Sequence, residues 1–161
     1  MANPWQGNQR NGSKVTVGSE AIYIEGLSDF NRALRAVDAE YPKAMRRAGY
    51  GLARGLVLAA RAQATGMSIR TGSKAARSLR AGTTASNAYV QGGGARYPYF
   101  YGAEFGSKRY GQFQSWRGNQ WGGWDGGPGY FLHPAIRKQG PALLRVYMAE
   151  LDRLTDQAFP G

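Results

Sequence analysis

The residue types that build catalytic and metal sites are scarce in this chain. It contains no cysteine and a single histidine, His133. Disulfides and thiolate metal sites are therefore excluded, and zinc, haem or Ser-His-type chemistry lacks its usual side chains. His133 lies between Leu132 and Pro134, where we expect it to be packed and hydrogen-bonded. The sequence predicts a protein that is not an enzyme and that binds no cofactor or metal.

Long apolar runs are also missing. The longest mostly apolar run, Gly55 to Ala60, is far shorter than the roughly 20 residues of a membrane-spanning helix. The first residues, Met-Ala-Asn-Pro-Trp-Gln-Gly-Asn, have no apolar core and do not resemble a signal peptide. We therefore expect a soluble protein, made without export and without a membrane partner.

Acidic residues are rare in the middle of the chain. Residues 41–117 carry 13 basic side chains and one acidic side chain, Glu104, whereas the net charge of the whole chain is +11. The excess charge is therefore concentrated, which suggests a basic surface facing nucleic acid or an acidic protein. The plain alternative is a solvated surface without a specific partner. The candidate basic face consists of Lys43, Arg47, Arg54, Arg61, Arg70, Lys74, Arg77 and Arg80.

The pattern of apolar residues, glycines and prolines predicts one α+β domain over residues 14–161, preceded by a mobile arm, residues 1–13. We expect a strand pair at 15–17 and 21–25, then a helix at 30–41 that is broken near Pro42 and a second helical stretch to about residue 64. A loop with one or two helical turns should follow at 65–82, and then a strand at 83–91 in a small antiparallel sheet. The last elements expected are a short helix at 99–105 and a final helix at 141–158.

The segment 106–130 is predicted to be a large loop inserted before the last helix. Its 25 residues include eight glycines and six aromatic residues. Aromatic side chains are frequent anchors of protein interfaces, so we expect this loop to dock against a neighbouring subunit. The alternatives are a loop folded back on its own core, or stacking on single-stranded bases. The candidate interface residues are Tyr110, Phe113, Trp116, Trp121, Trp124 and Tyr130.

Glu104 is the one carboxylate among the 13 basic residues of the middle region. A carboxylate in such a setting is expected to be ionised and paired. General acid–base catalysis would need a second group within reach. We therefore expect Glu104 to form a structural ion pair with a nearby arginine.

Three segments carry a resemblance to the tail-completion proteins (head–tail joining, or neck, proteins) of long-tailed bacteriophages, and a fourth segment is partly similar. Tyr101-Gly-Ala-Glu-Phe-Gly-Ser107 is similar to the family's aromatic-x-x-Glu-Phe-Gly-Thr element, with serine in place of threonine. Gly129-Tyr-Phe-Leu-His-Pro-Ala-Ile136 is similar to its Pro-Phe-Leu-x-Pro-Ala return into the last helix. Ile24-Glu-Gly-Leu-Ser-Asp-Phe30 leads from a strand into the first helix, as in the family. Thr71-Gly-Ser-Lys-Ala-Ala-Arg-Ser-Leu79 is similar to a Thr-Gly-x-Leu-Arg-x-Ser segment, but has an insertion and no early leucine.

The resemblance implies a structural virion protein at the head–tail neck, present in the host cytoplasm during assembly. Its partners would be copies of itself in a six-fold ring, the tail terminator or tube and the head connector (stopper). DNA would pass through the ring, with possible non-specific contact. The residues alone leave an alternative, a nucleic-acid-binding protein that uses the basic 43–117 region.

Overall fold

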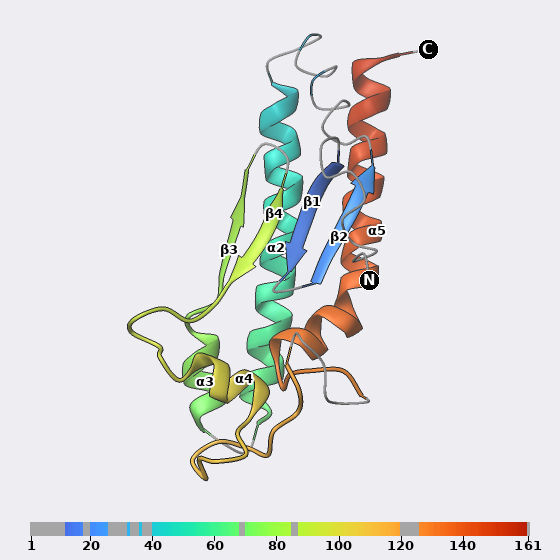
Figure 1. The fold of residues 1–161 in the computed structure, drawn as a ribbon. Helices are drawn as coiled ribbons and strands as arrows, with labels where there is room; N and C mark the ends of the chain where they lie inside the picture. The colour runs from blue at the N-terminus through green and yellow to red at the C-terminus, as the bar shows by residue number, and fades with distance from the viewer. Residues whose placement is uncertain are drawn as a thin grey trace, which may run out of the picture.

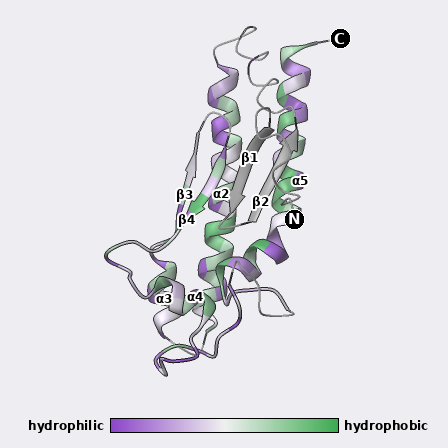
Figure 2. Ribbon diagram, viewed as in Figure 1, coloured by the Kyte–Doolittle hydropathy of each residue, from purple (hydrophilic) through white to green (hydrophobic). Residues whose placement is uncertain are grey.

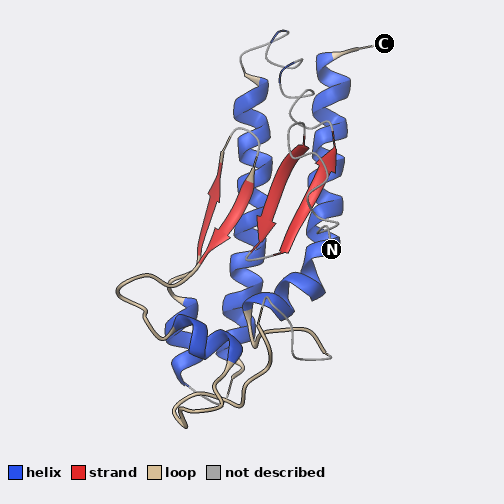
Figure 3. Ribbon diagram, in the orientation of Figure 1, coloured by secondary structure: helices blue, strands red, loops and turns tan. Residues whose placement is uncertain are grey.

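The computed structural model describes residues 12–17, 20–25, 32, 36, 40–67, 70–84, 87–119 and 126–160. The elements are β1 (Gly12–Val17), β2 (Glu20–Glu25), α2 (Tyr41–Thr65), α3 (Arg70–Ala76), β3 (Arg80–Thr83), β4 (Ala88–Gln91), α4 (Phe100–Phe105) and α5 (Leu132–Ala158). A sheet lies along the two long helices, α2 and α5, and the short helices α3 and α4 lie beyond one end of the sheet (Figures 1 and 3). The fold is of the α+β class, as the sequence predicts.

The sheet has four strands in the order β2-β1-β4-β3. The expected hairpin is present, with Val17 opposite Glu20 in an antiparallel pair. β1 then pairs with β4 in parallel, so the sheet is mixed and larger than the small antiparallel sheet expected. β1 begins at Gly12, inside the segment predicted as an arm; residues 1–11 lie outside the described part.

The expectation of one strand over 83–91 is wrong, because a turn after Thr83 separates β4 from β3, and most of β3 lies in the segment 65–82 that the sequence predicts to be a loop. The backbone N–H of Thr84 donates to the carbonyl of Asn87 at 2.7 Å. The N–H of Asn87 donates in return to the hydroxyl of Thr84 at 3.0 Å. These two bonds close the turn, and the two short strands pair in antiparallel fashion.

Helix α2 matches the predicted second helical stretch. Pro42 lies in its first turn, where the missing N–H costs nothing. One side of the helix is buried, and apolar residues gather along its middle (Figure 2). Gly55 allows α5 to approach, since an added Cβ would lie 2.8 Å from Leu143 Cδ2. The predicted helix over 30–41 falls outside the described residues apart from Arg32, Ala36 and the last two positions.

Helix α5 is continuous from Leu132 to Ala158, with Pro141 inside it. The prediction of a last helix that begins only at residue 141 is therefore wrong. Proline in a helix interior removes one hydrogen bond and kinks the helix without always ending it. The first turns of α5 run at an angle to the rest (Figure 1). Tyr147 and Leu151 beyond the bend are buried and belong to the core that also contains α2.

The hydrophobic core joins the helix pair, the end helices and the β3–β4 strands. Leu56, Leu79 and Phe131 have at most 1% of their surface exposed and come from distant parts of the chain. The edge of the Phe131 ring meets the Phe100 ring, with centroids 5.7 Å apart. This contact attaches the beginning of α5 to α4, and therefore places the two ends of the predicted loop side by side.

Candidate interaction surfaces

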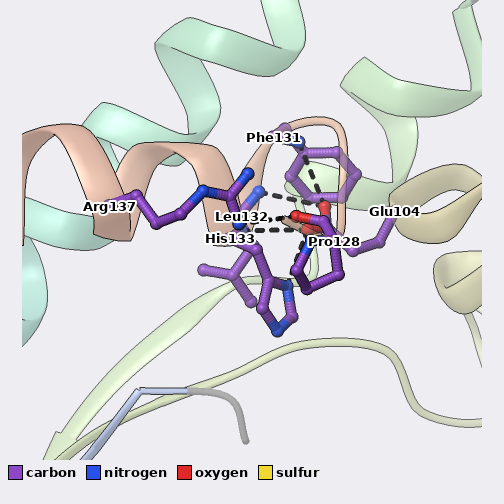
Figure 4. Close-up of polar contacts among 6 residues, drawn as sticks. All are labelled: Glu104, Pro128, Phe131, Leu132, His133 and Arg137. Carbon is purple, nitrogen blue, oxygen red and sulfur yellow. Dashed lines mark hydrogen bonds and ion pairs between the residues drawn. The ribbon is translucent and has the colours of Figure 1, made fainter. Parts of the chain in front are cut away.

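Glu104 lies at the junction between α4 and α5 and accepts hydrogen bonds from the first backbone amides of α5. Its Oε2 accepts from the N–H groups of Phe131 and Leu132 at 3.2 and 2.9 Å, and its Oε1 accepts from that of His133 at 2.9 Å (Figure 4). The first amides of a helix have no partner within the helix. Glu104 supplies the cap from a distant part of the sequence, and none of its own surface is exposed.

His133 completes this junction. Its Nδ1 lies 2.8 Å from Glu104 Oε1, and its side chain is 4% exposed. The expectation of a packed, hydrogen-bonded histidine is thus confirmed. The expectation of an arginine partner for Glu104 is wrong, because among the described residues the side chain that contacts the carboxylate is that of His133. The arginine drawn near the site, Arg137, instead donates to the carbonyl of Pro128 at 2.8 Å (Figure 4).

Two glycines make the junction possible. Gly129 has a φ of +88°, and an added Cβ would collide with Glu104 Oε1. Gly106 has a φ of +78°, and its added Cβ would collide with the carbonyl oxygen of Ser115. Residues that carry a Cβ rarely adopt a backbone conformation with positive φ. Both ends of the 106–130 loop therefore need glycine for the chain to pass close to the junction.

The first part of the loop, residues 106–119, folds back on α4. The N–H of Ser107 donates to the Gln114 carbonyl at 2.9 Å, and that of Arg117 donates to the Phe105 carbonyl at 2.7 Å. The hydroxyl of Tyr130 donates to the Ser115 carbonyl at 2.6 Å. These bonds form a compact lobe over residues 106–119, which agrees with the alternative of a loop folded on its own core for this part of the loop.

The candidate interface residues of the loop divide into three groups. Phe113, Trp116 and Tyr130 are half-buried within the chain, and Lys108 Nζ lies 4.4 Å from the centre of the Trp116 ring. Among the four described candidates, Tyr110 is exposed, with 57% of its surface accessible. Trp121 and Trp124 lie outside the described residues. A docking role of the loop therefore depends on Tyr110 and on residues whose positions are not described.

The predicted basic face of α2 is not one uniform surface. Lys43 pairs with Glu40 at 2.7 Å. The Arg61 guanidinium donates to the carbonyls of Ala76 and Leu79 at 3.3 and 2.9 Å and so fastens the end of α3 to α2. Arg54 remains exposed. The single basic face expected from the sequence is therefore interrupted, because Lys43 and Arg61 have local partners.

The remaining members of the candidate basic face are Arg47 on α2 and the cluster Arg70, Lys74, Arg77 and Arg80, all of them exposed. The cluster follows α3 into the beginning of β3. Arg47 turns instead toward α5, where it lines a groove. The sequence thus located the basic residues correctly but did not show that they face different directions.

The groove lies between α2 and α5 and has a volume of about 680 Å³. Gly51 forms part of its floor, and Val146 on the opposite helix is 69% exposed. Gly49, two residues from Gly51, contacts β3 and β4. Residues two apart in a helix point in nearly opposite directions, so the groove opens on the face away from the sheet. The groove was not expected from the sequence, although the repeated glycines of α2 are a signal of close packing.

Two side chains that line the groove have pKa values shifted from their ordinary values. Burial raises the pKa of the Tyr147 phenol. The hydrogen bond from Arg153 lowers the pKa of the Glu150 carboxyl, and the two side chains lie 2.6 Å apart at the rim. The groove is therefore apolar along its floor, with a charged pair at its edge. This composition is typical of a protein contact surface.

The described residues contain no group of three or more histidine, cysteine, aspartate or glutamate side chains that could hold a metal ion. Among the same residues, no helix has the length and apolar character needed to cross a bilayer. A scan against protein-family models found no match, and searches of curated proteins and of solved structures found no similar protein.

Proposed function

We propose that this chain is a structural protein of a long-tailed bacteriophage that completes the tail and forms a ring at the head–tail interface. One observation carries the proposal. Glu104 of the 101–107 segment is bonded to the backbone of the 129–136 segment, and these are the segments that resemble the tail-completion family. The shared residues thus form a single structural junction, which makes their joint occurrence more specific than two separate motifs.

Two different surfaces fit a closed ring. A ring of identical subunits needs a heterologous contact, in which one patch of each subunit binds another patch of the next. The α2–α5 groove involves the first half of α2 and the later turns of α5. The 106–119 lobe lies near the other end of the helix pair (Figure 1). We assign the groove to one patch of the subunit contact and the lobe, with Tyr110, to the patch that meets it on the next subunit.

In this proposal the protein acts in the virion neck, between the tail terminator or tube and the head connector. The excess positive charge of residues 41–117 faces either the DNA that passes through the ring or an acidic neighbouring ring. A subunit of this kind needs no catalytic group, and its work is done by surface complementarity and charge.

The deciding experiment is electron microscopy of lysates from phage that lack this gene product. We expect filled heads beside unattached tails, and complementation by the wild-type protein as the control. Complete particles with normal necks would contradict the proposal.

A second experiment tests the subunit contact. Val146→Glu introduces a charge into the groove, whereas Leu58→Glu places the same charge at an exposed residue of α2 that does not line the groove. We expect Val146→Glu to remain monomeric in sedimentation and Leu58→Glu to assemble like the wild type. Equal assembly of both variants would remove the groove from the contact.

The second candidate function is nucleic-acid binding through the basic 43–117 region. The exposed arginines of α3 and β3 favour it. A protein that binds mainly phosphates loses affinity steeply as salt rises, whereas a ring protein is expected to bind DNA weakly. Affinity measured over a salt series therefore separates the two candidates.

A further inference from the structure

A polar pocket lies where the β3–β4 pair ends and the connection to α4 begins. Its volume is about 370 Å³, within the range of about 300–1,000 Å³ that is usual for small-ligand sites. Its walls are formed by Ser78, Arg80, Gln91 and the segment 92–97. This connection projects from the body of the molecule (Figure 1). The pocket is therefore accessible to a large ligand as well as to a small one.

Two arginines line the pocket without a carboxylate beside them. Arg80 begins β3 and Arg96 lies in the connection, and both are exposed. None of the lining residues is acidic. Within the described part of the chain, neither guanidinium has a hydrogen bond or an ion pair. Glu104, the only acidic residue between 41 and 117, is occupied by the amides of α5. Both cations are thus available to an anion.

One wall of the pocket is a glycine turn that is held in place by its neighbours. Gly93 and Gly94 have φ values of +86° and +108°, which glycine adopts without strain. The N–H of Gly93 donates to the Ser78 hydroxyl at 2.8 Å, and that hydroxyl donates to the Ala75 carbonyl at 2.6 Å. Phe100 packs under the same turn. The turn is therefore attached to the end of α3 and to the core.

Backbone donors are free in this turn. Among the described residues, the N–H groups of Gly94, Ala95 and Arg96 have no hydrogen-bond partner. A Cβ added to Gly94 would meet nothing within 4 Å, so the backbone there is open to a ligand. Arginine forks and backbone amides are the donors that bind phosphate oxygens in proteins.

We propose that this pocket binds a phosphate group, held by the Arg80 and Arg96 side chains and by the backbone of the glycine turn. The phosphate belongs either to the backbone of a nucleic acid or to a free phosphate compound. The proposal is independent of ring formation, because the pocket is formed by one subunit.

The test compares Arg80→Gln/Arg96→Gln with Lys138→Gln/Arg145→Gln in the full-length protein. The second pair removes the same charge from exposed positions of α5. The probes are a fluorescein-labelled DNA duplex, followed by anisotropy over a salt series, and inorganic phosphate, followed by calorimetry. Thermal melting of each variant checks that the fold is intact, as expected for exposed side chains without partners.

If the bound phosphate belongs to a nucleic acid, we expect the pocket variant, Arg80→Gln/Arg96→Gln, to bind the duplex at least about tenfold more weakly than the wild type. The slope of its affinity against salt concentration should fall by the equivalent of one or two phosphate contacts. The α5 variant should lose much less. Arg80→Lys/Arg96→Lys should recover only part of the affinity, because lysine keeps the charge but not the paired donors. If only inorganic phosphate binding is lost in the pocket variant, the ligand is a free phosphate compound.

Two results would overturn the proposal. Equal losses in the pocket and α5 variants would show that general charge, and not the pocket, attracts the duplex. Unchanged binding of both probes in a folded Arg80→Gln/Arg96→Gln variant would show that the pocket is not a phosphate site.

Discussion

The strongest prediction concerns the Glu104 carboxylate. Replacing Glu104 by alanine leaves three backbone donors of α5 and the His133 ring without their acceptor in an environment closed to water. Hydrogen bonds to a charged group contribute about 1.5–3 kcal/mol each but are not additive. Breaking a buried pair by removing one partner costs about 3–5 kcal/mol. We therefore expect Glu104→Ala to lower the free energy of unfolding by about 3–5 kcal/mol.

Glu104→Gln keeps the volume and one acceptor oxygen, so its cost should be about 2–3 kcal/mol. For a chain of this length each kcal/mol corresponds to about 2–4 °C in Tm. The alanine variant should thus melt about 6–20 °C below the wild type. The assay is thermal and urea unfolding followed by circular dichroism. The matched control is Glu150→Gln, which breaks an exposed ion pair and should leave Tm nearly unchanged.

A local measurement distinguishes the loss of the Glu104 junction from a general loss of stability. Because Glu104 joins the two ends of the 106–130 loop, trypsin should cleave after Lys108 and Arg109 faster in Glu104→Gln than in the wild type, well below the melting temperature. A Glu104→Gln protein with wild-type Tm and wild-type cleavage would refute the capping role derived from the hydrogen bonds.

Three other changes test separate parts of the fold. Gly129→Ala forces a side chain into a positive-φ conformation against Glu104 and should cost at least about 2 kcal/mol in urea unfolding. Arg61→Gln removes both bonds to the end of α3 and should cost about 1–2 kcal/mol, whereas Arg54→Gln should change stability by less than about 0.5 kcal/mol. Tyr147 has its pKa raised by burial above the ordinary value of 10.0, so the unfolded chain ionises first and stability falls as pH rises past 10. Tyr147→Phe should therefore reduce the fall of the urea midpoint between about pH 9 and about pH 11. The same pH dependence in the variant and the wild type would contradict the raised pKa of Tyr147.

Local signals in the sequence were sufficient for several elements. The break near Pro42 and the apolar pattern after it predicted α2, and the pattern of glycines and prolines predicted the short helix α4. The Gly18-Ser19 pair predicted the β1–β2 hairpin. Each of these features depends on residues that are neighbours along the chain, where propensity and turn chemistry act directly.

The features that sequence reasoning missed depend on distant residues. The parallel pairing of β1 with β4 joins Thr16 to Tyr89, and nothing in either strand marks its partner. The continuity of α5 through Pro141 is supported by burial of the turns on both sides, which overrides the local preference for a break. Tertiary packing thus determined the outcome where the local signal was weak.

Glu104 shows why charge composition alone gave the wrong partner. Thirteen basic residues surround it in sequence, which favoured an arginine. In the fold the first amides of α5 and His133 meet the carboxylate. A helix N-terminus carries a partial positive charge and unpaired donors, so it can satisfy a buried carboxylate without burying a guanidinium. The core junction therefore depends on backbone amides and does not use an arginine. Arg80 and Arg96 stay exposed and are available to an external anion.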